Sequence, residues 1–568
     1  MRLFLFIYLI LLFSGGLLSQ EIIVSAKKID LNESDSNEVN SSNIQASDLK
    51  ENVSIDTESV GFGGVSQVGI RGLGKGSVTT FLDEVELTDS SDINGSSQLQ
   101  YINFSILKNY SLTQNDLKSN SFENSLIFNT LDKNELKLMY GSNNTSLMAL
   151  SLNSSQSFST KIHISRLYSD GISKVRDQSV KNLENDFFVS NNFFARVDKK
   201  IHHLNPYLGF YIIDGKQDID GFNSASFTPE DLIENDLSTY KQYIFLIGTR
   251  YKKNNLHRFN IFYNSNKLKR IENTPFLFKY NSNAKRVTFD QEHIFSELLN
   301  FKIFSFYEDE NAFILNDSHS RNKWLLAISN KMIFKNFSIK PYFKVYNESD
   351  YSYPLGIDIN TKFHPRIEST LSLSQTKKYP SLFQLFDSSS GNKKLNPENL
   401  QKINLRNLYK GPFFTLSKDL FFYKMNNKIS FDRKYLNIER STHYGLEINS
   451  KIKSSIAIFN LAYRYLNASD KENSQLPLIP EHKARVGVEK TFSNIQANFN
   501  AIYKSSTTSF SKNKISSYML FNLGLAYKIN KNFNIDINFH NLFNSVYEDI
   551  EYYNTRGFSS YASISFTP

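Results

Sequence analysis

The stretch Phe533-Asn534-Ile535-Asp536-Ile537-Asn538-Phe539-His540 alternates strictly between apolar and polar residues. Successive side chains on a β-strand point to opposite faces, so this stretch predicts a strand with one apolar and one polar face. The same pattern recurs at residues 521–528 and 562–566. From about residue 135 onward the chain repeats such segments of roughly eight to twelve residues, each followed by a polar turn.

Two architectures fit alternating strands, a soluble β-sandwich and a transmembrane β-barrel. Sandwich strands are usually about five or six residues long, whereas the segments here are longer and continue without helical interruption. In a bilayer every backbone group must be paired, and only a closed sheet achieves this. We therefore predict an all-β transmembrane barrel. Its roughly 435 residues, at about 20 per strand and connection, give about 22 antiparallel strands, with a lumen wide enough to need a plug.

The composition supports this prediction. The 568 residues include 48 Phe and 31 Tyr, yet the mean hydropathy is only −0.39 and no long apolar run follows residue 19. These properties exclude membrane-spanning helices and suit strands that face lipid at alternate positions. The net charge of +9 is spread along the chain, which does not favour nucleic-acid binding. The absence of cysteine excludes disulfides.

The chain predicts four regions. Residues 1–19, with Arg2 before the apolar run 3–13, are typical of a signal peptide, and an uncleaved anchor is the alternative. Residues 20–58 predict a flexible linker, because residues 27–58 are polar and acidic and have no clear apolar period. Residues 59–132, with short alternating runs and many glycines, predict a small α+β domain, and residues 133–568 predict the barrel.

Two segments of the small domain carry a family resemblance. Val68-Gly69-Ile70-Arg71-Gly72-Leu73-Gly74, followed by Phe81-Leu82-Asp83-Glu84-Val85, resembles the plug signature of the TonB-dependent receptor family. The resemblance implies that the small domain plugs the lumen and that Arg71, Gly72 and Asp83 hold it there, with Arg71 buried among acidic groups. Glu84 departs from the family pattern, which has glycine at this position. A generic glycine-rich turn is the alternative, and a phosphate-binding loop is disfavoured because its spacing is absent.

The segment Glu21-Ile22-Ile23-Val24-Ser25-Ala26 resembles the TonB box of the same family. The TonB box is the extended segment that pairs, as an added strand, with the periplasmic energy-coupling protein. An ordinary leading strand is the alternative interpretation of these six residues.

The barrel region also carries the resemblance. A motif in the middle of this region resembles the family's mid-barrel signature. Its residues are Tyr379, Pro380, Leu385, Gly391, Asn392, Pro397 and Glu398. Phe566 resembles the terminal aromatic residue recognised during barrel assembly, although Thr567 and Pro568 follow it. Residues 107–130 lack the glycines usual at the end of the family's plug, so ligand contacts cannot be carried over to this segment.

One acidic segment suggests a metal site. Asp214, Asp218 and Asp220 could supply oxygen ligands to calcium, but their spacing does not match the helix-loop-helix calcium site, and a solvated acidic turn is favoured. We expect no cofactor and no catalysis, because the sequence has no cysteine nucleophile, zinc-helix histidine pair or serine elbow.

The resemblance implies an importer in the cell outer membrane of a Gram-negative bacterium. Its expected partners are the TonB complex of the inner membrane, a small-molecule chelate and outer-membrane lipid, with no nucleic acid. The expected substrate is a ferric siderophore or cobalamin, which the sequence does not separate. A passive porin, or a structural or adhesive barrel without energy coupling, is the alternative function.

Overall fold

In the computed structural model the chain divides into two units, residues 1–35 and 36–568, and only residues of the second are described. The described residues are 36–38, 46–57, 64, 67–155, 158–176, 184–223, 228–230, 237–253, 255–271, 277–296, 298–314 and 317–568.

A closed antiparallel barrel dominates the described part of the chain, with 22 strands that span it. In order around the barrel from the first strand, these are β8 (Glu135–Gly141), β9 (Thr145–Ser155), β10 (Phe158–Ser169), β11 (Phe188–Lys199), β12 (Leu204–Asp218), β15 (Leu237–Lys252), β16 (Leu256–Ile271), β17 (Leu277–Ser296), β18 (Leu299–Ile314), β19 (Asp317–Ile333), β20 (Phe337–Asn347), β22 (Leu355–His364), β23 (Ile367–Lys378), β24 (Glu398–Lys410), β25 (Phe414–Asp432), β26 (Lys434–Lys453), β27 (Ile458–Asp470), β28 (His482–Phe492), β29 (Ile495–Lys504), β32 (Tyr518–Lys528), β33 (Phe533–His540) and β34 (Ser559–Phe566). The last strand pairs with the first, Phe566 opposite Leu136, and this closes the barrel. The prediction of about 22 antiparallel strands is confirmed.

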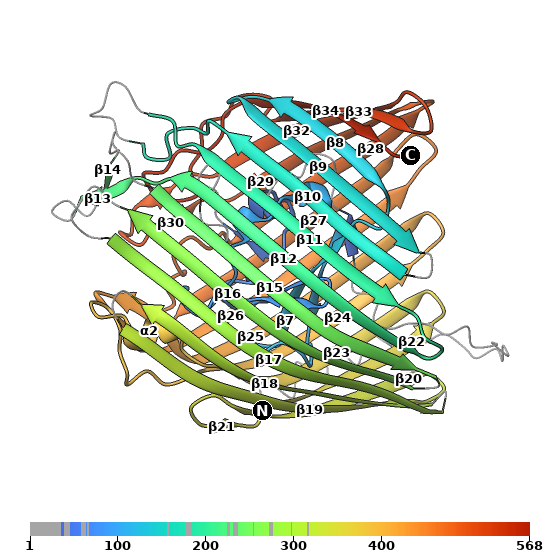
Figure 1. Cartoon of the computed structure of the whole chain (residues 1–568), viewed down its shortest axis with the longest axis vertical. Helices are drawn as coiled ribbons and strands as arrows, with labels where there is room; N and C mark the ends of the chain where they lie inside the picture. Colours follow the sequence, from blue (N-terminus) through green and yellow to red (C-terminus); the bar gives the residue numbers. More distant parts are fainter. Residues whose placement is uncertain are drawn as a thin grey trace. The chain divides into compact units, whose positions relative to one another are not determined.

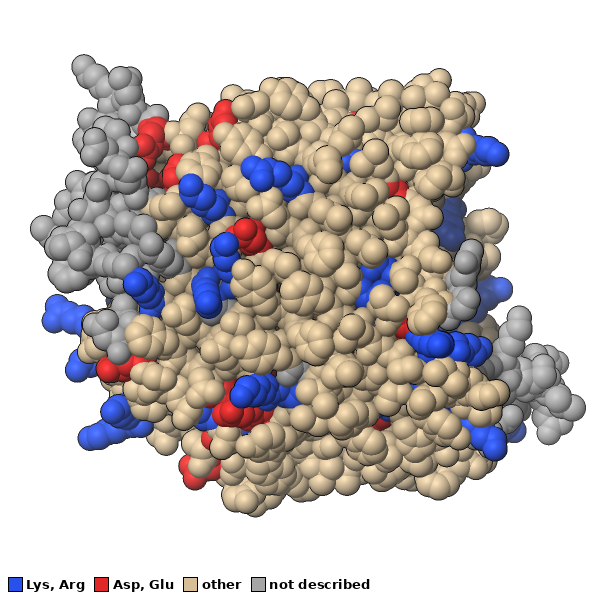
Figure 2. All heavy atoms as spheres, viewed as in Figure 1, with Lys and Arg blue, Asp and Glu red and all other residues tan. Residues whose placement is uncertain are grey.

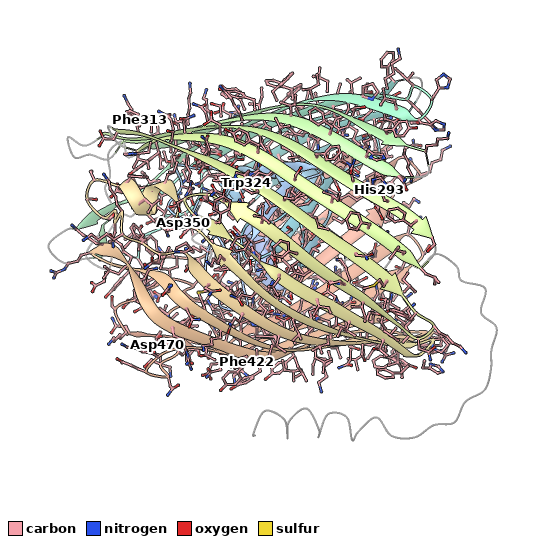
Figure 3. All side chains as sticks on the ribbon, turned by 90° about the horizontal axis from the view of Figure 1, so that it is seen from below. His293, Phe313, Trp324, Asp350, Phe422 and Asp470 are labelled. Atoms are coloured by element: carbon pink, nitrogen blue, oxygen red, sulfur yellow. The ribbon has the colours of Figure 1, made fainter. Side chains whose placement is uncertain are left out.

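The two ends of the barrel differ in the length of their connections. At the end where β8 begins and β34 ends, neighbouring strands are joined by short turns such as 200–203 and 334–336. At the other end the connections are longer, such as 379–397 and 541–558. We call these the turn end and the loop end. Figure 3 labels Asp350 and Asp470 at the loop end, and His293 towards the turn end.

Three pairings that involve short strands, and one short helix, lie in or beside the long connections. They are β13 (Gly221–Asn223) with β14 (Thr228–Glu230), β21 (Tyr351–Ser352) against β20, and β30 (Thr507–Thr508) with β31 (Lys514–Ile515), together with α2 (Leu382–Phe386) before β24. Among the described residues no helix is long and apolar enough to cross a membrane.

Side chains alternate between the two faces of the barrel wall as the sequence predicts. On β33, Asn538 and His540 are buried towards the lumen, whereas Ile537 is 37% exposed on the outer face. On β34, Ser563 and Ser565 are buried and Ile564 is exposed. An apolar outer face is the expected form for strands that contact lipid, because lipid cannot hydrogen-bond to polar side chains.

The small domain lies inside the barrel. Its sheet has the order β1-β6-β7-β4-β5, in which β4 and β7 are parallel and the other pairs antiparallel. Figures 1 and 3, from perpendicular directions, both draw this blue domain within the ring of strands. Its strands are β1 (Ser36–Glu38), β2 (Ile55–Asp56), β3 (Gly69–Ile70), β4 (Thr79–Leu82), β5 (Val85–Leu87), β6 (Leu107–Gln114) and β7 (Asn124–Thr130), and its helical turns are the 3₁₀ elements η1 (Ala46–Glu51), η2 (Leu99–Tyr101) and η3 (Phe104–Ile106).

The structure differs from the predicted linker, residues 20–58, at its C-terminal part. Residues 46–57 form η1 and β2, and Leu49 and Ile55 are fully buried. The acidic residues that suggested a solvated segment bind barrel cations instead, as Asp48 binds Arg556 with 3.0 Å between carboxylate oxygen and guanidinium nitrogen. Composition alone therefore misassigned a short segment whose charges are neutralised in the lumen.

A hydrophobic core joins the small domain to the barrel wall. Tyr101 is completely buried, and its ring stacks against those of Phe188 and Tyr240 at centroid distances of 5.8 and 5.2 Å. Gly215 makes room for this ring, since a Cβ at this position would lie 2.0 Å from Tyr101. Tyr101 is thus an apolar anchor of the small domain.

Candidate functional site

Arg71, which follows β3, is held by three adjacent barrel strands. Its Nη2 lies 2.6 Å from Oε2 of Glu447 and 3.6 Å from Oδ1 of Asp419. Its Nη1 donates to the Tyr423 hydroxyl at 2.7 Å and to Asn404 Oδ1 at 3.0 Å. Burial alone would lower the pKa of Arg71, but Glu447, Tyr423 and Asp419 raise it well above the ordinary value. The side chain is only 3% exposed, so it is a charged group whose solvent has been replaced by the barrel wall.

Gly72 allows this contact because no other residue fits its position. Its φ is +73°, and a Cβ would lie 2.8 Å from the Cβ of Ala468. Its backbone N–H donates to Oδ2 of Asp56 at 2.9 Å, and the other oxygen of Asp56 accepts from Arg464 at 2.7 Å. Asp56 is therefore a functional candidate that the sequence analysis missed, because it lies in the predicted linker.

Asp83 forms the two-residue turn between β4 and β5 together with Glu84. Its φ is +52°, and its carboxylate accepts from the backbone N–H and the hydroxyl of Thr130 at 3.0 and 2.9 Å. Asp tolerates the left-handed conformation better than most residues, which explains the acidic residue at this position. Glu84 does not have a positive φ, so the glycine of the family pattern is not needed there.

Glu84 instead places a carboxylate among three barrel arginines. Its oxygens lie 3.0 Å from Arg250, 3.4 Å from Arg196 and 3.5 Å from Arg258. Burial would raise the pKa of Glu84, but Arg258, Arg250 and Arg196 lower it to about 2. The departure from the family pattern therefore adds a multiple ion pair between the small domain and the wall.

Most ion pairs between the small domain and the barrel have the same polarity, with the acid on the small domain and the base on the barrel. They join Asp48 to Arg556, Glu51 to Arg485, Asp56 to Arg464, Glu84 to Arg196, Arg250 and Arg258, Glu86 to Arg286, and Glu123 to Lys344 and Lys402. Arg71 reverses this polarity. Contacts of this kind can be exchanged for water or for other polar partners, so they hold the domain in place but remain reversible.

A polar cavity lies between the small domain and the loop end. Its lining includes residues 94–97 and 120–121 of the small domain and residues 378–382 of the connection before β24. Hydroxyl and amide groups dominate this lining. Two of its basic side chains, Arg321 and Lys323, are paired with Glu310 at 2.6 Å. The cavity is the best candidate among the described residues for a site that holds a small polar ligand.

The predicted mid-barrel signature forms the connection that partly covers this cavity. Tyr379 donates its hydroxyl to the Asp350 carbonyl at 2.6 Å, and the Pro380 carbonyl accepts from Arg321 at 2.8 Å. Ser381 caps α2 in a capping box with Gln384 and donates to the Ile93 carbonyl of the small domain at 2.6 Å. This sequence therefore builds a short, capped helix that touches the small domain.

The other signature residues fix the shape of the same connection. The Gly391 N–H donates to the Asp387 carbonyl at 2.8 Å, and a Cβ at this glycine would lie 2.5 Å from that oxygen. Asn392 donates to the Tyr435 carbonyl at 2.9 Å, and Glu398 accepts from the Ile429 N–H at 2.9 Å. Leu385, within α2, is partly buried and packs against the cluster that contains Leu382, and Pro397 directly precedes β24.

Phe566 lies on the closing strand β34, and its ring contacts that of Phe533 at a centroid distance of 4.8 Å. The residues predicted as a coupling segment, Glu21, Ile22, Ile23, Val24, Ser25 and Ala26, lie outside the described residues.

The three aspartates proposed as calcium ligands are not brought together. Asp214 faces Lys241 on the neighbouring strand, with 3.9 Å between its carboxylate oxygen and Nζ. Asp218 accepts weakly from the Phe187 N–H at 3.4 Å. Asp220 instead lies with Glu184 and Asp186, whose ligand atoms are all within 4.8 Å of one another. In this acidic group, Glu184 and Asp186 therefore stand in place of Asp214 and Asp218, because residues 184–186 lie close to Asp220.

Comparison with known proteins extends these observations. The family model described as TonB dependent receptor-like, beta-barrel, matches residues 80–542. No curated protein sequence matches the chain. Similar solved structures include the siderophore receptor PirA from Acinetobacter baumannii, with a TM-score of 0.78, 11% identity and coverage of 92% of this chain and 98% of that one.

Two further similar structures are iron-related receptors. The FrpB iron transporter from Neisseria meningitidis has a TM-score of 0.77 and 11% identity, with coverage of 93% and 97%. A variant of the ferric enterobactin receptor PfeA from Pseudomonas aeruginosa has the same TM-score and identity, with coverage of 92% and 98%. At this identity the similarity establishes the fold.

Proposed function

This chain belongs to the TonB-dependent receptor family, and from this premise we propose that it imports a scarce nutrient chelate across the outer membrane by coupling to the TonB complex of the inner membrane. Members of the family are transport receptors, and nutrient uptake is their common activity. In our proposal the substrate binds at the loop end, the coupling protein pairs with residues 21–26, and pulling displaces the small domain.

The observation that carries this proposal is the way the small domain occupies the lumen. Ion pairs and hydrogen bonds of Arg71, Asp56 and Glu84 tie it to the wall, so it can leave the lumen only if these contacts rearrange. A passive porin needs an open lumen, so a domain attached within the lumen favours an energy-coupled importer over the passive alternative. No nucleotide or redox cofactor is needed, because the work is mechanical.

For the substrate we propose a ferric siderophore, with cobalamin as the second candidate. The similar structures are described as the siderophore receptor PirA, the iron transporter FrpB and the ferric enterobactin receptor PfeA, which supports iron. The hydroxyl and amide groups that line the polar cavity support a small chelate rich in hydrogen-bonding groups, and both candidates have such groups.

The coupling proposal is tested by deleting residues 21–26 and by a milder substitution, Val24→Pro. Proline cannot donate to an added strand, so uptake should fall to the level of a strain without TonB, while the barrel stays folded and in the membrane. Val24→Ala is the matched control, because it shortens the same side chain and keeps the N–H. Unchanged uptake in the deletion variant would refute energy-coupled import.

The substrate is tested by growth on a panel of ferric siderophores and cobalamin, with and without the gene. A ferric siderophore that supports growth only when the gene is present would support iron uptake. Growth dependence on cobalamin alone would replace iron by the second candidate.

A further inference from the structure

Four lysines form a row on the outer face of the barrel near the loop end. They lie on four adjacent strands, Lys216 on β12, Lys241 on β15, Lys267 on β16 and Lys279 on β17, and all four are exposed. We call them the lysine row. Figure 2 shows lysine and arginine side chains gathered on the part of this face that lies towards the loop end.

The strand register brings these like charges together. Lys241 lies directly opposite Lys267. Lys267 is opposite Asn281, which places Lys279 diagonally beside it. Directly opposite side chains have their Cβ atoms about 5 Å apart, and diagonal ones about 7–8 Å apart, so like charges here are destabilising unless an anion lies between them.

The protein itself supplies too few anions. Asp214 lies 3.9 Å from Lys241, and Asp218 follows Lys216 on the same strand. Among the described residues no other carboxylate lies within 4.0 Å of the row. Four cations against two carboxylates leave an excess of positive charge on this part of the outer face.

The lysine row lies just beyond the apolar part of the wall. On β15, Lys241 precedes the outward residues Tyr243, Phe245 and Ile247, and Phe245 and Ile247 are 43% and 47% exposed. On β16, Lys267 follows Ile261 and Tyr263, which are 42% and 41% exposed. Aromatic residues mark the edge of the hydrocarbon region of such barrels, so the row lies at the level of lipid headgroups.

We propose that the lysine row binds the phosphate groups of a phosphorylated lipid in the outer leaflet. Long loops of outer-membrane barrels face the exterior, which assigns the loop end to that leaflet. A phosphate can lie between Lys241 and Lys267, where it accepts from both ammonium groups and removes their repulsion. The inference needs the barrel to lie in an outer membrane, but it needs neither transport nor coupling to TonB.

The test uses the full-length receptor in neutral detergent and lipid A carrying two phosphates as the probe, with bound lipid counted by native mass spectrometry. Each lysine near an anionic lipid surface contributes about 5-fold to affinity. The double variant Lys241→Gln, Lys267→Gln should therefore bind the lipid about 30-fold more weakly than the native protein. Lipid A without its phosphates should bind the native protein as weakly as the diphosphorylated lipid binds this variant.

Lys377→Gln is the matched control. Lys377 also faces outward near the loop end, but its cross-strand neighbour is Asn399, so it has no lysine opposite. This variant should bind the phosphorylated lipid within about 2-fold of the native protein, because only one isolated surface charge is removed. Heat-dependent migration on gels, which reports a closed barrel, checks the folding of every variant.

Three results would overturn the proposal. The first is equal binding by the native protein and the double variant, and the second is an equal loss in the Lys377→Gln control. The third is displacement of the lipid by excess inorganic phosphate at constant ionic strength, which would mean that free phosphate suffices. Lipid binding is also measured for the Val24→Pro variant. A transport defect with normal lipid binding in this variant would support both proposals independently.

Discussion

Arg71 and Glu84 belong to the same small domain, and opposite charges of the barrel hold both, yet their surroundings differ. Arg71 is 3% exposed and makes one 2.6 Å contact with Glu447, supported by hydrogen bonds to Tyr423 and Asn404. Glu84 is 22% exposed and shares its oxygens among three arginines at 3.0–3.5 Å.

The comparison indicates that opposite charge alone does not set the strength of attachment. When one member of a buried ion pair is removed, the remaining charge has neither a partner nor solvent. When one member of a partly exposed pair is removed, water and salt ions take its place. We therefore expect the contacts of Arg71 to contribute most of the polar free energy that attaches the small domain. The contacts of Glu84 should contribute less and should vary with pH and salt.

The largest effect is expected for Arg71→Ala. This change leaves Glu447 buried without its guanidinium, which costs about 3–5 kcal/mol of the free energy that docks the small domain. Amide hydrogen exchange at residues 67–72 should accelerate accordingly, while exchange in the barrel strands stays unchanged. Arg71→Lys is the matched control and should cost less, because it keeps the charge but loses the planar fork. If residues 67–72 exchanged at the native rate in Arg71→Ala, the expected difference between the Arg71 and Glu84 contacts would be contradicted.

A smaller effect is expected for Asp83→Ala, which acts on the turn that carries Glu84. The change removes two hydrogen bonds to Thr130 and places alanine at a φ of +52°, so the small domain should lose about 2–3 kcal/mol of stability. Asp83→Asn should cost less, since asparagine tolerates this conformation and keeps an acceptor. Exchange of the Thr130 amide reports the loss directly, and equal rates in both variants would contradict it.

The sequence predicted the barrel well and the attachment of the small domain only in part. Alternation is a local property, so stretches such as 533–540 disclose both the strand and its two faces. Arg71 and Gly72 could be singled out because their motif is contiguous. The three arginines around Glu84 could not, because Arg196, Arg250 and Arg258 meet only after the register of three strands is set.

The same reason explains the other differences. Gly215 in the wall accommodates Tyr101, more than a hundred residues earlier, and no local pattern relates the two. The acids Asp48 and Asp56 look solvated in the sequence because their partners, Arg556 and Arg464, lie near the other end of the chain. Long-range neutralisation turns a segment that looks like a linker into part of a folded domain.

Glu84 should give a pH-dependent attachment. Its pKa of about 2 lies below the ordinary 4.5, so the stabilisation is complete above pH 4.5 and is lost as the pH falls towards 2. Glu84→Gln should remove this dependence and cost about 1–2 kcal/mol at neutral pH, less at high salt because the site is partly exposed. Exchange of the Val85 amide, measured across this pH range in both proteins, is the test. If Glu84→Gln kept the native pH profile of exchange, a group other than Glu84 would be responsible for the titration.

The smallest effect is expected for Lys108→Ala, and it separates burial from distance. Lys108 and Asp132 lie 2.7 Å apart, closer than Glu84 lies to any of its arginines, but their side chains are 50% and 58% exposed. If distance decided the strength of an ion pair, this change would cost more than Glu84→Gln. Because solvent and salt screen an exposed pair, we expect a loss below about 0.5 kcal/mol. Exchange of the Lys108 and Thr130 amides measures it, and a loss above that of Glu84→Gln would show that burial is not what ranks these contacts.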